Sequence, residues 1–334
     1  MCVAKKIIAV TMGDAAGIGP EVVVKALGDP KVYEICSPLL IGDGGVIEKT
    51  IKLLDSSLSL RPVKSVDDIE GRYGVIDIID LQNLHGDVIP GKVSADCGRA
   101  AMEYIGKAAE ITGSGEAAAM ATAPINKESI ASAGYPDTGH MRYLARITGT
   151  TEYAAMLMTG TLRVVHLSDH YSLKEACDLV KRNLILARLK LIRDSFLKWN
   201  LNNPRIGVAA LNPHGSDGGL FGNQEETEIL PAVNDAKKQG IDASGPFPAD
   251  SIFNRAISGE FDVILAMYHD QGHIAVKVHG FEKSVAVTLG LPFVRTSVDH
   301  GTAFDIAGKG IADHRGMIEA ISTAVDLSQR GYGR

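Results

Sequence analysis

Residues 11–21, with the sequence TMGDAAGIGPE, join a predicted strand at Ile7–Thr11 to a predicted helix that begins at Pro20. A proline lacks the N–H group that the first turn of a helix leaves unbonded, so Pro20 marks a helix start. The glycines between strand and helix allow the backbone to approach a ligand closely, although a tight turn alone would also explain them. The spacing fits neither the dinucleotide fingerprint nor a phosphate-binding P-loop. This segment therefore predicts one strand–helix unit with a polar, glycine-rich loop.

The same alternation continues along the chain. Short runs of β-branched residues are followed by stretches of helical period, such as Val180, Leu184, Ala187 and Leu191 on one face. Strands that alternate with helices indicate βαβ units and a largely parallel sheet, which is the α/β class. The expected strands are Ile7–Thr11, Leu39–Ile41, Val75–Ile79, Ala118–Thr122, Ala154–Met158, Leu162–His166, Ile206–Leu211, Val263–Met267, Val285–Leu289 and Phe293–Val298.

The length and the net charge of the chain limit the classes of protein to which it can belong. A chain of 334 residues is long for one core and sufficient for two domains. No Pro/Ser-rich linker divides it, so the two domains should be closely joined, with a ligand in the cleft between them. A formal net charge of −6 argues against a nucleic-acid-binding protein, which usually presents a basic face. A small anionic substrate remains possible because a few cations in one cleft are enough to bind it.

The cysteines and the apolar runs indicate in which cellular compartment the protein works. Four cysteines stand at positions 2, 36, 97 and 177, and no two have CxxC spacing. Thiols this sparse are typical of a reducing environment. The apolar run at the N-terminus is too short for a signal peptide, and no run approaches the ~20 residues of a membrane span. We expect a cytoplasmic protein that does not bind membranes.

A second polar loop follows the expected strand at Ala118–Thr122. It reads Thr-Ala-Pro-Ile-Asn-Lys at residues 122–127, with Gly139 and His140 further along the chain. Lys127 could hold a phosphate or carboxylate, or act as an acid. A solvated surface lysine is the commoner explanation of such a residue.

Three histidines stand where expected strands give way to loops. They are His170 in HLSDHYSL, His214 in LNPHGSDGG and His269 in MYHDQGH. Parallel sheets place their ligands at the loops after the strands. Three imidazoles would bind Zn²⁺ or a similar metal and leave positions open for substrate. Their separations of 44 and 55 residues match no local zinc signature, so spacing alone does not establish a metal site.

Four neighbours of these histidines complicate the assignment. Asp270 and Asp250 could orient the ligands or bind a harder ion. Asp250 could equally be a helix N-cap, since it follows Pro248. His166 and His273 could be mistaken for the ligands themselves.

A last glycine-rich loop covers residues 298–310, VDHGTAFDIAGKG. Its small residues would let the backbone wrap a flat group, although an ordinary connection is also possible. Asp305 could accept hydrogen bonds from ribose hydroxyls, and its charge would repel a 2′-phosphate, which favours NAD.

Taken together, these segments resemble the 4-hydroxythreonine-4-phosphate dehydrogenase family of vitamin B6 synthesis. The resemblance covers nearly the whole chain in many ordered blocks, which chance does not produce. Its blocks are VTMGDAAGIGPEVVVKAL, GKVSADCGRAAMEYI, TAPINKESI, LNPHGSDGGLFGNQEETEILPAV, GPFPADSIF, AMYHDQGHIAVKVHGF and TLGLPFVRTSVDHGTAFDIAGKG.

The resemblance implies a fold and an assembly. The family has the isocitrate/isopropylmalate dehydrogenase type of fold, with two α/β domains, an inter-domain cleft and a homodimer. We expect residues 1–130 and 290–334 to form the cofactor-side domain, and residues 131–289 to form the metal, substrate and dimerisation domain.

The resemblance also implies roles for individual residues. The family's metal ligands fall on His170, His214 and His269, with the site shared across the dimer and Zn²⁺, Mg²⁺ or Co²⁺ as the ion. Its substrate-binding residues fall on His140, Lys277 and Arg295, and Lys127 matches a lysine of the family's loop. The cofactor loop supplies His300, Gly301, Thr302, Asp305 and Ile306, and the Asp-Ile pair is typical of NAD-using members.

Three positions depart from the family pattern. Ala15 replaces a proline, which should matter little. Met141 replaces a threonine that would contact phosphate, although Arg142 could offer another contact, and Ala286 replaces a substrate-binding asparagine. The stretch VVHLSDHYSLKEAC is more similar to a branch that acts on 4-phospho-threonate or 4-phospho-erythronate. A third branch oxidises terephthalate cis-dihydrodiol.

The reaction implied is oxidation of a small phosphorylated hydroxy acid, with a divalent metal as Lewis acid, NAD as hydride acceptor and loss of CO₂ from the 3-keto product. Lys277 and Arg295 would hold the anionic groups, and His140 would orient the substrate. Lys127 and Asp270 are both candidates for the catalytic acid or base. A relative that binds a phosphorylated metabolite without turnover is the alternative from another functional class.

Overall fold

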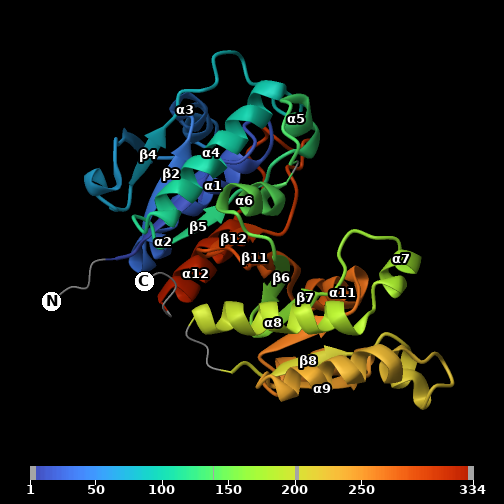
Figure 1. The fold of residues 1–334 in the computed structure, drawn as a ribbon. Helices are drawn as coiled ribbons and strands as arrows, with labels where there is room; N and C mark the ends of the chain where they lie inside the picture. The colour runs from blue at the N-terminus through green and yellow to red at the C-terminus, as the bar shows by residue number, and fades with distance from the viewer. Residues whose placement is uncertain (1–4, 138, 200–202, 330–334) are drawn as a thin grey trace. The chain divides into compact units, whose positions relative to one another are not determined.

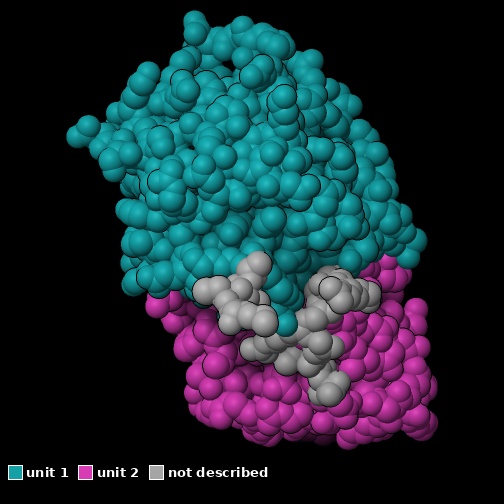
Figure 2. Space-filling view, turned by 90° about the vertical axis from the view of Figure 1, so that its left-hand side faces the viewer, with its two compact units in different colours: residues 1–151, 291–334 teal, residues 152–290 magenta. Residues whose placement is uncertain are grey.

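The computed structural model describes residues 5–137, 139–199 and 203–329, and the chain divides into two compact units (Figures 1 and 2). Unit 1 comprises Met1–Thr151 with Leu291–Arg334, and unit 2 comprises Glu152–Gly290. The expected division after residue 130 thus falls inside unit 1, which keeps residues 131–151. Cys2 lies outside the described residues.

Unit 1 is built on a parallel sheet in the order β3-β4-β2-β1-β5-β12. The strands in chain order are β1 (Ile7–Thr11), β2 (Ser37–Gly42), β3 (Ser59–Pro62), β4 (Val75–Asp80), β5 (Ala119–Thr122) and β12 (Arg295–Val298). Strand β3 was not expected from the sequence because its pattern, Ser-Leu-Arg-Pro, is polar and lies at the edge of the sheet.

Side chains cap the start of several helices of unit 1. Asp29, Asp43, Ser94 and Asn126 each accept a hydrogen bond from a backbone N–H in the first turn of the helix that follows. The helices are α1 (Gly19–Leu27), α2 (Pro30–Ile35), α3 (Gly44–Leu53), α4 (Ala95–Gly113), α5 (Lys127–Ser132), α6 (His140–Thr148) and α12 (Arg315–Gln329), with a 3₁₀ turn at Val66–Asp68. The helix expected near Pro20 is α1, which starts one residue earlier.

Unit 2 has a mixed sheet in the order β11-β6-β7-β10-β8-β9. Strand β6 pairs antiparallel with β7 and β11, and the other pairs are parallel. The strands are β6 (Ala154–Thr159), β7 (Leu162–His166), β8 (Ile206–Ala209), β9 (Ala243–Phe247), β10 (Val263–Ala266) and β11 (Val285–Leu289). Strand β9 was not expected because its sequence, Ala-Ser-Gly-Pro-Phe, contains two residues that weaken strands, and its pairing with β8 is irregular.

The helices of unit 2 are α7 (Leu173–Asp178), α8 (Arg182–Lys198), α9 (Leu230–Lys238), α10 (Ala249–Ile257) and α11 (His269–Gly280), with short turns at Pro213–Asp217, Glu225–Ile229 and Phe281–Lys283. Asp250 is not the N-cap of α10, since Pro248 takes that position. The carboxylate instead lies in the first turn, where the helix dipole favours a negative charge.

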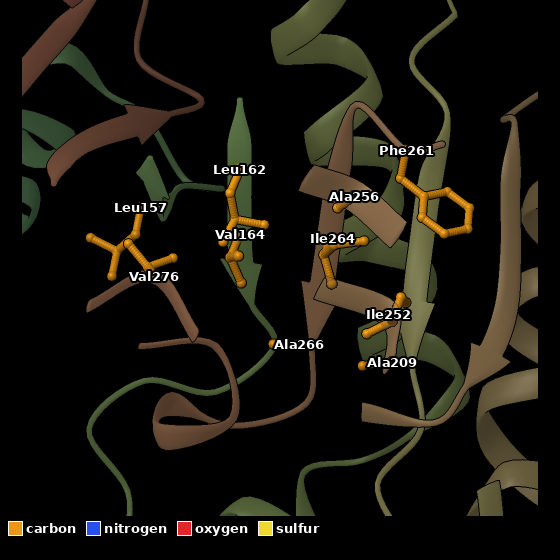
Figure 3. Close-up of a cluster of buried hydrophobic side chains, with 10 residues drawn as sticks. All are labelled: Leu157, Leu162, Val164, Ala209, Ile252, Ala256, Phe261, Ile264, Ala266 and Val276. Carbon is orange, nitrogen blue, oxygen red and sulfur yellow. The ribbon is translucent and has the colours of Figure 1, made fainter. Parts of the chain in front are cut away.

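The core of unit 2 lies between its sheet and two helices (Figure 3). Val164 on β7 and Ile264 on β10 are fully buried and share one cluster with Ile252 of α10 and Val276 of α11. Burial of this apolar surface fixes α11 against the sheet, and thereby fixes the start of α11 at His269. Among the described residues, no helix is long and apolar enough to cross a membrane.

Helix α4 crosses α5 at a glycine, and this crossing sets the position of α5 in unit 1. A Cβ atom added to Gly98 would overlap the backbone carbonyl of Ser129, whereas one added to Gly113 of the same helix would meet the Phe293 ring at an ordinary 3.9 Å. We expect Gly98→Ala to lower the free energy of unfolding by about 1–3 kcal/mol, the usual cost of overpacking. Gly113→Ala is the matched control and should be neutral in the same urea titration. Equal midpoints for both variants would contradict the close packing of α4 on α5.

Candidate active site

Two of the three predicted metal ligands line one cavity in unit 2. His170 lies in the loop after β7, and His269 is the first residue of α11, directly after β10. Because β7 and β10 are parallel neighbours, their carboxyl ends bring both loops to the same edge of the sheet. The cavity has a volume of about 280 Å³, and Asp169, Tyr268 and Asp270 also line it. The rings of His170 and His269 lie 5.9 Å apart, inclined at 51°.

Asp270 orients the imidazole of His269. Its Oδ1 lies 2.7 Å from Nδ1 of His269, so this nitrogen carries the proton that the carboxylate accepts. The Nε2 atom is then the nitrogen with a lone pair for a metal. A carboxylate behind a ligating histidine is the usual arrangement in metal sites, and it raises the basicity of the ligand.

His214 lies in an unusual loop after β8. His214, Ser216 and Asp217 have positive φ angles of 56°, 72° and 44°. The loop is held at its start by Glu225, whose carboxylate accepts hydrogen bonds from the backbone N–H groups of Leu211 and Asn212 at 2.9 and 2.8 Å. In the described part of the chain, no three His, Cys, Asp or Glu residues are grouped closely enough to hold a metal. The structure therefore brings His170 and His269 together, but it does not bring His214 to them.

The donors around this cavity suit a borderline divalent metal in kind, because imidazole and carboxylate are its usual ligands. Two imidazoles from a single chain are too few for a complete site. A further ligand would have to come from His214 or from a second copy of the chain.

A second polar cluster lies in unit 1, around Arg295 on β12. Its guanidinium donates through Nε and Nη2 to Oγ1 of Thr122, at 3.1 and 2.7 Å. Only 4 % of Arg295 is exposed, and this burial lowers its pKa to about 9. A buried guanidinium is a strong attractor for a phosphate or carboxylate.

His140 begins α6 beside Arg295. Burial, and secondarily the charge of Arg295, hold the pKa of His140 well below its ordinary value, so the ring is neutral near pH 7. Its Nε2 is buried and has no hydrogen-bond partner among the described residues. Met141 follows it in the first turn and is half-buried, while Arg142 is exposed. The first turn of a helix, a neutral imidazole and a guanidinium together form a site suited to an anion.

Asp14 was missed by the sequence reasoning. It is fully buried in the loop after β1, and its Oδ1 accepts a hydrogen bond from Ala16 N at 2.9 Å. Burial raises the pKa of Asp14, although the Ala16 N–H group opposes this effect. Its backbone N–H donates to Pro124 O at 3.0 Å, so this carboxyl group lies beside the loop that carries Lys127. A carboxylate in a glycine-rich loop after a strand was the available signal.

Other predicted residues are placed as follows. Lys127 is exposed at the start of α5. Lys277 of α11 donates to Ser284 Oγ at 3.1 Å, and its ammonium lies 4.7 Å from the centre of the Phe281 ring. Ala286 on β11 packs against the core cluster of unit 2, so this side chain contributes to packing.

The predicted cofactor loop is tied to the loop after β1. Ile18 N donates to Thr302 O at 3.0 Å, and Gly308 N donates to Glu21 Oε1 at 2.7 Å. Gly308 also lines a cavity of about 200 Å³ with residues that follow β1, β2 and β4. His300, Gly301 and Asp305 are exposed, and Ile306 is half-buried. The loop thus presents polar groups at the carboxyl ends of parallel strands, which is where α/β proteins bind nucleotides.

These features define an α/β protein whose polar loops gather at the carboxyl ends of parallel strands. The chain matches the model of the family described as pyridoxal phosphate biosynthetic protein PdxA over residues 34–324, and it belongs to that family. The resemblance inferred from the sequence is confirmed, as is the α/β fold with two units.

Named relatives cover nearly the whole chain. A D-threonate 4-phosphate dehydrogenase from Cupriavidus necator is 45 % identical over 97 % of this chain and 98 % of its own. The solved structure of a 4-hydroxythreonine-4-phosphate dehydrogenase from Burkholderia phymatum is 43 % identical, with a TM-score of 0.88 over 97 % of this chain and 99 % of that one. A terephthalate 1,2-cis-dihydrodiol dehydrogenase from Burkholderia xenovorans is 29 % identical, with a TM-score of 0.66 over 96 % and 98 %. All three are named dehydrogenases, so the family is one of oxidoreductases.

The burial of His140 predicts acid sensitivity. Its pKa in the folded protein lies below the ordinary value of 6.5, so only the unfolded chain takes up this proton as the pH falls through 6.5. Proton uptake by the unfolded chain therefore favours unfolding below that pH, by up to about 1.4 kcal/mol per pH unit. We expect the free energy of unfolding of the wild type to fall more steeply than that of His140→Gln between pH 7 and 5, in urea titrations. Exposed His85→Gln is the control, and a slope for His140→Gln that parallels the wild type would contradict this burial.

Proposed function

We propose that this protein oxidises D-threonate 4-phosphate with NAD and a divalent metal. Oxidation at carbon 3 removes a hydride from that carbon and a proton from its hydroxyl, which gives a 3-keto acid that loses CO₂. The observation that carries the proposal is the 45 % identity, over nearly the full length of both chains, to a protein named for this activity. The cavity lined by His170 and His269 and the buried Arg295 supply matching chemistry.

When bound, a metal supplies Lewis-acid polarisation of the substrate hydroxyl, and NAD supplies the hydride acceptor. His170 and His269 would be two of the metal ligands, with His214 as the third. Asp270 would leave Nε2 of His269 as the ligating nitrogen through its 2.7 Å contact with Nδ1.

The anionic groups of the substrate need fixed cations. Arg295 and neutral His140 offer a guanidinium and an imidazole in unit 1, and Lys277 offers an ammonium in unit 2. Half-buried Met141 presents no hydroxyl to a phosphate, and Ala286 faces the apolar core. Neither position favours the hydroxythreonine substrate, whose family pattern has polar residues there.

The proton of the hydroxyl requires a base. Lys127 and Asp270 are the two candidates carried over from the sequence, and both are exposed. Asp270 is engaged with His269, which makes it a positioning group. Lys127 is therefore the better candidate to move a proton.

The nucleotide would bind at the loop that contains His300, Gly301, Thr302, Asp305 and Ile306. Exposed Asp305 can accept hydrogen bonds from ribose hydroxyls and repels a 2′-phosphate, which supports NAD over NADP.

The alternatives have weaker support. The terephthalate dihydrodiol dehydrogenase is only 29 % identical, compared with 45 % for the D-threonate 4-phosphate dehydrogenase. A binder without turnover would need neither the imidazole pair at the cavity nor a cofactor loop.

The proposal is tested by NADH release at 340 nm from D-threonate 4-phosphate and from 4-hydroxythreonine phosphate, each with and without a chelator. We expect turnover of the former, abolished by chelator and restored by Zn²⁺, Mg²⁺ or Co²⁺. His269→Gln should lower kcat/KM by at least ~100-fold because it removes a proposed metal ligand. His85→Gln, an exposed histidine elsewhere, should match the wild type. Preference for 4-hydroxythreonine phosphate, or turnover that resists the chelator, would overturn the proposal.

We also propose a homodimer that shares the metal site. Helix α11 exposes Ile274 and Val278, at 61 % and 82 %, one turn apart on one face, and Phe281 follows at 70 %. An exposed apolar stripe of this kind is typical of a protein interface. It begins on the helix that starts at His269, so a second copy seated there would approach the cavity.

We expect Val278→Glu to convert a dimer into a monomer in light scattering after gel filtration, with loss of metal-dependent turnover. The matched control is Ile311→Glu, which changes a similarly exposed apolar residue of unit 1. A wild-type monomer with full activity would show that the site is complete in one chain.

A further inference from the structure

Behind His269, two further histidines of unit 2 form a contiguous stack. His273 lies one turn along α11, and its ring packs on that of His269 with centroids 3.6 Å apart and planes inclined by only 15°. At the edge of the His273 ring, Nδ1 lies 3.2 Å from Nε2 of His166. The three rings connect the wall of the cavity to the buried end of β7.

The helix is shaped around the deepest of these rings. His166 is 1 % exposed, and a Cβ atom added to Gly272 would overlap its Nε2. Any larger residue at position 272 would therefore displace the ring. Gly272 precedes His273 directly. The same turn of α11 therefore leaves space for the His166 ring and carries His273, which contacts that ring.

The deepest ring lies beside an acidic side chain. Asp169 Oδ1 lies 3.7 Å from Nδ1 of His166, which is too long for a hydrogen bond. Arg188 on α8 lies near Asp169 and donates to Leu167 O at 3.3 Å and to Tyr153 O at 3.1 Å. Arg188 thus restrains the loop that carries Asp169 and His170.

These contacts restrain His269 from two sides. Asp270 holds Nδ1 in the ring plane, and His273 covers the ring face. We propose that His273, itself held by His166, is a positioning residue that fixes the ring plane of His269 so that Nε2 is presented to the cavity. The proposal rests on the proposed function in that His269 binds a divalent metal.

Simple core packing is the competing explanation, and the two differ in what they require. Packing needs only a flat apolar ring at position 273, whereas positioning through His166 also needs the nitrogen at Nδ1. His273→Phe keeps a ring to stack on His269 and removes the hydrogen bond, whereas His273→Ala removes both. His166→Gln keeps a polar partner for His273.

The first readout is Co²⁺ binding to the full-length protein, followed by the visible absorption of the bound ion. Loss of a residue that orients a ligand usually costs 10–100-fold in metal affinity. We expect a loss of that size in His273→Ala with a changed spectrum, a smaller loss in His273→Phe, and near-wild-type binding in His166→Gln. His279→Gln, an exposed histidine on the same helix, is the control and should bind Co²⁺ like the wild type.

The second readout needs no metal. Nitrogen-15 NMR of the histidine rings in metal-free protein, with the His269 signals assigned by His269→Gln, should show a single tautomer protonated at Nδ1. His273→Ala should average the two nitrogens. If the wild type binds no Co²⁺ but this averaging occurs, the proposed metal fails while the positioning role stands.

Two results would overturn the inference. Unchanged Co²⁺ affinity and an unchanged tautomer in both His273 variants would show that the three histidines only pack together and do not position His269. Wild-type behaviour of His273→Phe together with a defect in His273→Ala would show that stacking alone suffices, which removes His166 from the proposal. If His273→Ala does not fold by circular dichroism, His273→Phe decides between the two explanations, because it keeps the stacked ring and removes the hydrogen bond.

Discussion

Parallel pairing of β7 with β10 is the constraint on which the candidate site of unit 2 depends. The register aligns His166 with Ala266 at the carboxyl ends of the two strands. The chain therefore leaves both strands at the same edge. His170 and His269 each follow the end of a strand by only a few residues, so both emerge at that edge. Had the two strands been antiparallel, their loops would leave from opposite edges and the cavity would have only one imidazole. The same rule operates in unit 1, where the loops after β1, β5 and β12 supply Asp14, Lys127 and His300.

Much of the polar chemistry in both units is buried, which opposes folding. Arg295, Asp14 and His166 are each less than 5 % exposed, and taking such groups out of water costs free energy that only partners can offset. Thr122 is one such partner for Arg295, and Ala16 N for Asp14. Asp14 and His166 are not fully satisfied by their partners, because Asp14 Oδ2 and His166 Nδ1 have no hydrogen bond among the described residues. Buried ionisable groups of this kind cluster at functional sites, so their burial supports a role in binding or in orientation.

How far the sequence predicts this structure depends on the range of the interaction involved. All ten expected strands are present because β-branched runs between helical stretches are a local signal. Strands β3 and β9 were missed because their residues, including Arg61, Pro62 and Gly245, are poor strand formers that only sheet pairing makes extended. His170 and His269 could be expected at the same edge of the sheet because each follows a strong strand, and they do line one cavity. The stack of His166 and His273 could not be predicted, since it depends on the pairing of β7 with β10 and on the space left by Gly272.

The conformation of His214 is explained neither by the local sequence nor by the contacts within one chain. Left-handed backbone at residues other than glycine costs of order 1–3 kcal/mol each, and three such residues occur here within four positions. Glu225 holds only the start of this loop, through Leu211 and Asn212, so it does not by itself account for the strain further on. Strain of this kind persists where surrounding groups over-determine the conformation, and it collects at sites that bind ligands. A metal shared with a second chain would supply such a restraint to His214. The gap between His214 and the pair of imidazoles is thus consistent with a ligand set that one copy of the chain cannot complete.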